Sequence, residues 1–131
     1  MKQIERVLLV DDDEITNRAN KRNILTSNCC LEVDVVSNGQ EAIEYFKRIQ
    51  ENKLKVDLML LDLKMPVMDG FDFLEKYKDL PTDLKASKVF GLTSSASFYD
   101  LEKLKAYVDI TGHIYKPFAT TDFINLLDKH F

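Results

Sequence analysis

Five short apolar runs alternate with five amphipathic segments along the whole chain. The runs are short enough for buried strands, and the segments between them carry apolar residues at helical spacing. The expected strands are 6–10, 31–37, 56–61, 87–94 and 112–117, and the expected helices are 14–28, 38–53, 69–80, 97–108 and 120–131. Strict alternation of this kind predicts an α/β fold, in which helices cover both faces of a parallel sheet.

The composition is that of one soluble globular domain. A chain of 131 residues can build a single core, so we expect one domain over residues 1–131. The formal net charge is -4 and no Lys/Arg cluster stands out, which argues against direct nucleic-acid binding. No apolar run has the length of a signal peptide or a membrane span. We therefore expect a cytoplasmic protein without membrane insertion, in which the adjacent Cys29 and Cys30 are buried thiols.

The apolar residues of the first four expected helices define the faces that we expect to be buried. They are Ile15, Ala19, Ile24 and Leu25; Ala42, Ile43, Phe46 and Ile49; Phe71, Leu74 and Tyr77; and Leu101, Leu104 and Val108. The last helix follows two threonines, so Thr120 or Thr121 is its expected N-cap.

Polar side chains follow four of the five strands at the point where the apolar run ends. They are Asp11, Asp12 and Asp13 after the first strand, Asp62 after the third, Thr93 and Ser94 on the fourth, and Lys116 on the fifth. Ligands of such sheets bind outside the carboxyl ends of the strands, so these side chains are expected to share one pocket. Taken singly, an aspartate here could be a helix N-cap and the lysine a surface residue. Their convergence on one edge favours a binding site.

Carboxylates held this close together repel one another and need a cation. Oxygen-only ligands suit a hard ion such as Mg²⁺. The lysine and the hydroxyl then remain to bind an anion with several oxygens, for which a phosphoryl group is the natural candidate. A carboxylate beside Mg²⁺ can act as a nucleophile toward phosphorus and form an aspartyl phosphate.

Four segments carry a family resemblance. The stretches "VLLVDDDE", "LMLLDLKMPVMDGF", "VFGLTSS" and "IYKPF" occur in the order and spacing of response-regulator receiver domains, the phosphoacceptors of two-component signalling. The chain resembles this family over its whole length. The resemblance implies a flavodoxin-like, doubly wound (βα)5 fold, a three-layer sandwich whose five-stranded parallel sheet has the order 2-1-3-4-5.

The resemblance also assigns roles to the acidic residues. Asp62 matches the phosphorylated aspartate. Asp12 matches a direct Mg²⁺ ligand and Asp11 one that acts partly through water, with Mn²⁺ as an alternative ion. Lys64 stands where the family supplies a backbone carbonyl to the metal. Asp13 lies outside the matched pair and is expected to be the N-cap of the first helix.

The remaining motif residues match the groups that bind and sense the phosphoryl group. Thr93 and Lys116 match its hydroxyl and ammonium partners, and Ser94 adds a second hydroxyl. The resemblance makes the Lys116–Pro117 bond a candidate cis peptide. His113 stands where the family usually carries Tyr or Phe, and we hypothesise that it acts with Thr93 as the switch.

The resemblance thus predicts a signalling switch that catalyses only its own phosphorylation and dephosphorylation. A histidine kinase or a phosphotransfer protein would phosphorylate it. The face of the fourth helix, fifth strand and fifth helix would then control binding of an unidentified downstream protein. Two alternatives are a pseudo-receiver binding module and a haloacid-dehalogenase-type phosphatase, whose Asp-x-Asp motif Asp11 and Asp13 would supply. Whether the chain acts alone or belongs to a longer protein stays open.

Overall fold

The computed structural model describes residues 2–65, 67–93 and 98–131. Five strands form one parallel sheet in the order β2–β1–β3–β4–β5, which confirms the predicted α/β topology. The strands are β1 (Ile4–Val10), β2 (Cys30–Val36), β3 (Leu58–Asp62), β4 (Lys88–Thr93) and β5 (Gly112–Tyr115). The helices are α1 (Glu14–Thr26), α2 (Gly39–Glu51), α3 (Gly70–Tyr77), α4 (Phe98–Lys105) and α5 (Thr120–His130), with a 3-10 turn at Thr82–Leu84.

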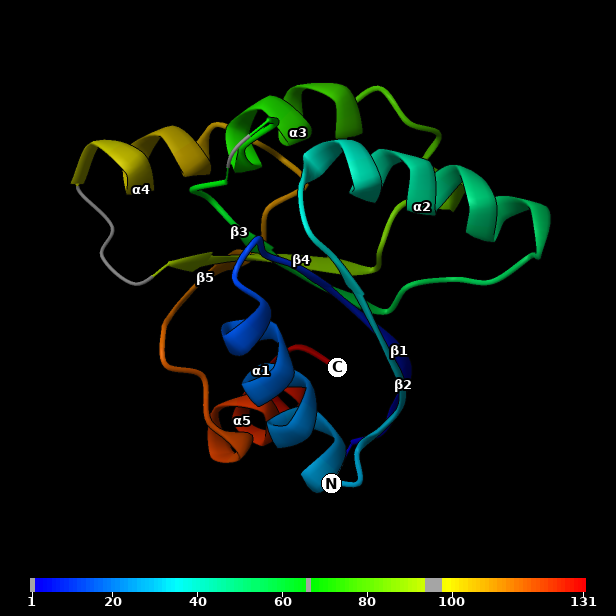
Figure 1. Ribbon diagram of the computed structural model, residues 1–131, viewed down its shortest axis with the longest axis vertical. Helices are drawn as coiled ribbons and strands as arrows, with labels where there is room; N and C mark the ends of the chain where they lie inside the picture. The colour runs from blue at the N-terminus through cyan, green and yellow to red at the C-terminus, as the bar shows by residue number, and fades with distance from the viewer. Residues whose placement is uncertain (1, 66, 94–97) are drawn as a thin grey trace.

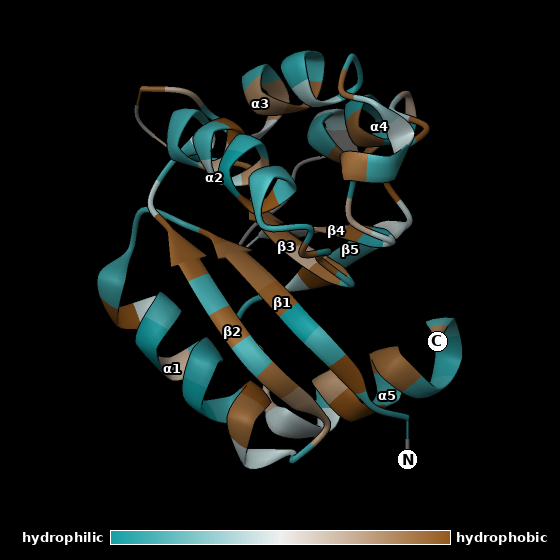
Figure 2. Ribbon diagram, turned by 90° about the vertical axis from the view of Figure 1, so that its right-hand side faces the viewer, coloured by the Kyte–Doolittle hydropathy of each residue, from teal (hydrophilic) through white to brown (hydrophobic). Residues whose placement is uncertain are grey.

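The helices form two layers on either side of the sheet. Figure 1 shows α2, α3 and α4 on one face and α1 and α5 on the other. Hydrophobic residues are frequent along the strands, and hydrophilic residues are frequent on the outer sides of the helices (Figure 2). No helix within the described ranges is long and apolar enough to cross a membrane.

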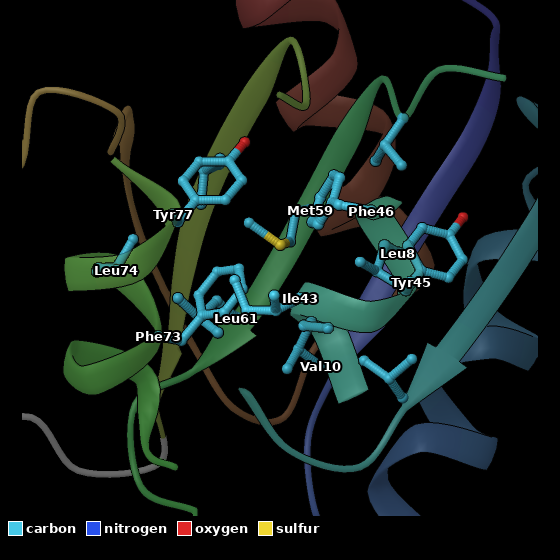
Figure 3. Packing of buried hydrophobic residues seen from close by; sticks show 14 of the residues in the cluster. Leu8, Val10, Ile43, Tyr45, Phe46, Met59, Leu61, Phe73, Leu74 and Tyr77 are labelled. Carbon is cyan, nitrogen blue, oxygen red and sulfur yellow. The ribbon is translucent and has the colours of Figure 1, made fainter. Parts of the chain in front are cut away.

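Each face of the sheet has its own hydrophobic core. All five residues of β3 are buried, because a central parallel strand is covered on both faces. Met59 and Leu61 pack toward Phe46 of α2 and Tyr77 of α3 (Figure 3). Leu60 points to the opposite face, in the cluster beneath α1 and α5. Burial on both faces fixes the register of β3 and therefore the position of the residue that ends it.

The buried face of α1 differs from the prediction. Of the four apolar residues expected there, only Ile24 is buried, whereas Ile15 is 75% exposed. Asn17 and Asn20 are buried instead. The Asn17 amide donates a hydrogen bond of 2.7 Å to the carbonyl of Asp11, so this face of α1 serves the polar loop after β1. Ile15 lines a cavity of about 480 Å³ between α1 and the segment that follows β5.

The fourth helix is shorter than expected. It ends at Lys105, and Val108 is 95% exposed, so the prediction that Val108 shares a buried face with Leu104 was wrong. The chain leaves the helix in a tight turn, in which the Tyr107 N–H donates to the Leu104 carbonyl. Tyr107 is partly buried against the core beneath α2 and α3, and its hydroxyl donates to Glu75 of α3. Tyr107 rather than Val108 therefore contacts the core after the end of α4.

The N-cap of α5 is Ala119 rather than Thr120 or Thr121. The Thr120 hydroxyl donates instead to the carbonyl of Asn23 at 2.8 Å, which ties α5 to α1. The Asp122 carboxylate accepts the N–H of Ala119 at 2.8 Å from within the first turn. A tertiary partner for the threonine therefore outweighed its local capping preference.

Candidate functional site: an acidic cluster at the carboxyl edge of the sheet

The register of the sheet places two carboxylates side by side. Val10 of β1 pairs with Leu61 of β3, so the next residues, Asp11 and Asp62, are neighbours at the carboxyl edge. Both are buried, whereas Asp12 is exposed. One oxygen from each of these three carboxylates lies within 4.8 Å of the others. The predicted acidic pocket is therefore present as a geometric cluster.

Lys116 directly follows β5 at the same carboxyl edge of the sheet, and its side chain faces this cluster. Tyr115 pairs with Thr93, and the N–H of Lys116 donates to the Thr93 carbonyl at 2.7 Å. The Lys116 ammonium lies 2.7 Å from Asp11 Oδ2 and 3.6 Å from Asp62 Oδ1. Thr93 is buried one position beyond Leu92, the register partner of Asp62. The Lys116–Pro117 peptide is cis, as predicted.

The buried charges perturb one another. Burial, and next the charge of Asp11, raise the pKa of Asp62 to about 6, against the lowering effect of Lys116. Burial alone would lower the pKa of Lys116, but its hydrogen bond to Asp11 and the charges of Asp62 and Asp11 outweigh burial, so this pKa is raised. The lysine stays protonated and offsets part of the negative charge. Since three carboxylates face one ammonium, the cluster keeps an excess of negative charge.

The donor set fits a hard divalent cation. Asp11, Asp12 and Asp62 offer only oxygen, and their separation of at most 4.8 Å is close to that of ligands around one ion. Opposite oxygen ligands of octahedral Mg²⁺ lie about 4.2 Å apart. Small rotations of exposed Asp12 would close the remaining gap. These three residues could therefore hold Mg²⁺ or Mn²⁺.

Asp13 has a separate role from its two neighbours. It is the N-cap of α1, as predicted, and its carboxylate accepts the N–H groups of Ile15 and Thr16 at 3.0 Å and 3.4 Å. The Thr16 hydroxyl also donates to it at 2.8 Å. These bonds lower the pKa of Asp13, the hydroxyl of Thr16 having the largest effect. Asp11 in turn accepts the N–H of Asp13 at 2.9 Å, which fixes the acidic loop.

The loop after β3 wraps around the end of Asp62. The Lys64 N–H donates to Asp62 Oδ1 at 3.3 Å, while the Lys64 side chain extends away and its ammonium lies 3.3 Å from Asp100 of α4. Gly70 closes the loop, and a Cβ there would lie 2.7 Å from the Asp62 carbonyl oxygen. The link to Asp100 was not foreseen, since no local pattern joins residues that meet only through folding.

Two predicted site residues are not brought into the cluster by the described part of the structure. His113 is exposed on β5, with its ring edge-on to Tyr115 at 5.1 Å between centroids. Its switch role stays a prediction. Ser94 lies outside the described residues.

Comparison with known proteins assigns the chain to a family. Residues 7–128 match the family model of the response regulator receiver domain. The chain belongs to this family. It resembles a two-component response regulator from Cytophaga hutchinsonii with a TM-score of 0.88 and 26% identity, over 98% of this chain and 97% of that one. For the chemotaxis protein CheY4 of Vibrio cholerae the TM-score is 0.79 at 26% identity, over 98% and 99% of the two chains.

Curated relatives place the receiver domain in larger proteins. The probable transcriptional regulator ycf29 of Porphyra purpurea is 29% identical over 92% of this chain and 54% of its own length. The hybrid signal transduction histidine kinase B of Dictyostelium discoideum is 31% identical over 98% of this chain and 7% of its own. The chain thus spans about half of the first relative and a small part of the second. In these two relatives the region that resembles this chain is joined to further sequence of different length.

Proposed function

We propose that this receiver domain, residues 1–131, accepts a phosphoryl group on Asp62 and uses it as a signal for partner binding. The observation that carries the proposal is the position of the Lys116 ammonium, 2.7 Å from Asp11 and 3.6 Å from Asp62. A half-buried lysine between two carboxylates supplies the positive charge that an incoming phosphoryl group requires. Thr93 ends the neighbouring strand and would offer its hydroxyl to a phosphoryl oxygen.

The transfer needs one nucleophile and a donor. An oxygen of the Asp62 carboxylate attacks phosphorus, and the bond from phosphorus to the donor atom breaks. For a phosphohistidine donor that atom is an imidazole nitrogen, which keeps the electron pair and leaves as neutral imidazole if its other nitrogen is protonated. A histidine kinase or a phosphotransfer protein is the proposed donor, in keeping with the hybrid kinase among the relatives.

A divalent cation would complete the charge balance. Asp11, Asp12 and Asp62 would hold it, together with the backbone carbonyl of Lys64. Bound Mg²⁺ supplies positive charge that offsets the repulsion between the carboxylate and the phosphoryl oxygens. Lys116 and the buried walls of the site orient the acceptor and limit the access of water. The cytoplasmic location expected from the sequence stays a prediction.

The two alternative functions have less support. The phosphatase alternative requires Asp13 to act beside Asp11, but the Asp13 carboxylate is used to cap α1 through Ile15 and Thr16. The pseudo-receiver alternative requires a site that has lost its chemistry, whereas Asp62 and Lys116 lie close together here. The experiment below separates this alternative from the proposal.

The test is phosphorylation by acetyl phosphate with Mg²⁺, followed by intact-mass and peptide mass spectrometry. The wild-type protein should gain one phosphoryl group, mapped to the peptide that contains Asp62. Asp62→Asn should gain none, and chelation of Mg²⁺ should abolish the gain. Lys116→Met should slow the reaction on the order of a hundredfold, because it removes a charge that stabilises the transition state.

Asp79→Asn is the matched control, since it removes an exposed aspartate just after α3 and should leave the mass gain intact. A wild-type protein that folds but takes no phosphoryl group would be a pseudo-receiver. Equal labelling of Asp62→Asn and wild type would exclude Asp62 as the acceptor.

A further inference from the structure

Lys64 connects the acceptor site to α4. Its backbone N–H binds Asp62 Oδ1 at 3.3 Å, so its side chain starts beside the acceptor carboxylate. Its ammonium lies 3.3 Å from Asp100 Oδ2, in the first turn of α4. The Lys64 side chain is 70% exposed and the Asp100 side chain is 13% exposed. One end of the pair is therefore fixed in place, and the other is a long chain that can rotate.

Four of the seven side chains of α4 that the structure describes, residues 99–105, are exposed. Among its described side chains only Leu104 is buried, packed close against Gly91 of β4. Lys103 lies over the ring of Phe71 of α3, 4.4 Å from its centroid. Figure 1 shows α4 next to α3 in the outer helical layer. The ion pair between Lys64 and Asp100 links the amino-terminal turn of α4 to the loop after β3.

A phosphoryl group on Asp62 would compete with Asp100 for the ammonium of Lys64. A carboxylate carries one negative charge, whereas a phosphoryl group carries about 1.5 to 2 and presents three acceptor oxygens. A lysine ammonium has three hydrogen-bond donors on a flexible stem, so it can pair with whichever nearby group carries more negative charge. Because the stem of Lys64 begins beside Asp62, the ammonium can turn from Asp100 to the phosphoryl oxygens without movement of the backbone.

We propose that Lys64 exchanges Asp100 for the phosphoryl group on Asp62, and that this exchange loosens the first turn of α4. The inference rests on the proposed function, because it requires Asp62 to be the acceptor. It adds a route from the site to α4 that depends on one lysine and one aspartate of this chain. Asp100 stays at the amino end of the helix, where its charge is favourable, so α4 loosens without unfolding.

The size of the effect follows from the exposure of the pair. Because the Lys64 side chain is 70% exposed, solvent screens this ion pair and it stabilises α4 weakly, so its loss should speed amide hydrogen exchange in α4 by about threefold to fivefold. Such a change is measurable by hydrogen-exchange mass spectrometry on peptides that cover α4. Beryllofluoride with Mg²⁺ is the probe, since it mimics a phosphoryl group on aspartate, and fluorine NMR counts the bound fluoride.

Loading with beryllofluoride should accelerate exchange in α4 of the wild type. In Lys64→Met, α4 should already exchange at the loaded rate, with no further acceleration on loading. Lys105→Met is the matched control: it removes the pair with Glu102 at 3.0 Å, which lies within α4 itself. This variant should respond to loading as the wild type does.

A Lys64→Met protein that responds to loading as strongly as the wild type would overturn the inference. So would free Lys64→Met whose α4 exchanges at the free wild-type rate. If either result were found while fluoride bound to the wild type and not to Asp62→Asn, the inference about Lys64 would fail and the proposed function would stand. Absence of bound fluoride from the wild type would remove both.

Discussion

At the scale of single residues, three consecutive aspartates differ because their surroundings differ. Asp11 is buried beside Lys116, Asp12 is exposed at the rim of the cluster, and Asp13 caps α1. The cluster disfavours the charged form of Asp62, whose pKa is raised from 3.8 to about 6 by burial and by the charge of Asp11. We therefore expect the cluster to lower the stability of the metal-free protein.

This cost predicts a pH dependence of stability in metal-free buffer. Asp62 binds its proton more tightly in the folded state than in the unfolded state. Its contribution to the free energy of unfolding is therefore full below pH 3.8 and is lost as the pH rises through about 6. Asp62→Asn should avoid this loss of stability and be more stable than the wild type by about 3 kcal/mol above pH ~7. The difference should shrink toward acid pH.

Urea unfolding in the presence of a chelator, at a series of pH values, measures this difference. Parallel pH profiles of the two proteins would contradict the prediction. Addition of Mg²⁺ should stabilise the wild type more than Asp62→Asn, because binding to the folded state alone raises the free energy of unfolding.

At the scale of elements, the junction between β3 and α3 holds the acceptor in place. Gly70 begins α3 and its N–H donates to the Leu63 carbonyl at 3.3 Å. A Cβ on Gly70 would lie 2.7 Å from the Asp62 carbonyl oxygen and 2.8 Å from the Leu63 Cα. Both are backbone atoms of the segment that carries the acceptor, so this close approach requires glycine.

Gly70→Ala should therefore destabilise the protein by about 2 kcal/mol, since overpacking against backbone forces the chain to shift. It should also slow phosphorylation of Asp62, because the shifted segment carries that residue. Gly112→Ala is a fitting comparison: its added Cβ would meet the Phe90 ring at 3.2 Å and no closer atom. Thermal unfolding and acetyl phosphate labelling of both variants provide the measurements. Equal effects of the two substitutions would refute the role given to Gly70.

At the scale of the whole molecule, one sheet separates two cores. Phe46 belongs to the cluster beneath α2 and α3, and Phe123 to the cluster beneath α1 and α5. Both side chains are fully buried. The strands β1, β2, β3 and β4 each contribute residues to both clusters, so we expect the two cores to be lost together.

Phe46→Ala and Phe123→Ala should each cost about 3–5 kcal/mol of unfolding free energy. Each variant should still unfold in one transition, because the shared sheet couples the cores. Urea titrations followed by far-UV circular dichroism and by tyrosine fluorescence would test this. Separate midpoints for the two signals would show that the cores unfold independently.

The sequence by itself determined the strand and helix order, the parallel sheet and the edge at which its polar residues meet. These follow from local periodicity and from where each apolar run ends, as at Asp62 and Lys116. The tertiary structure decided the inner face of α1, the cap of α5, the end of α4 and the pairing of Lys64 with Asp100. Each depends on a partner distant in sequence, which can outweigh the local preference of a residue without leaving a pattern along the chain.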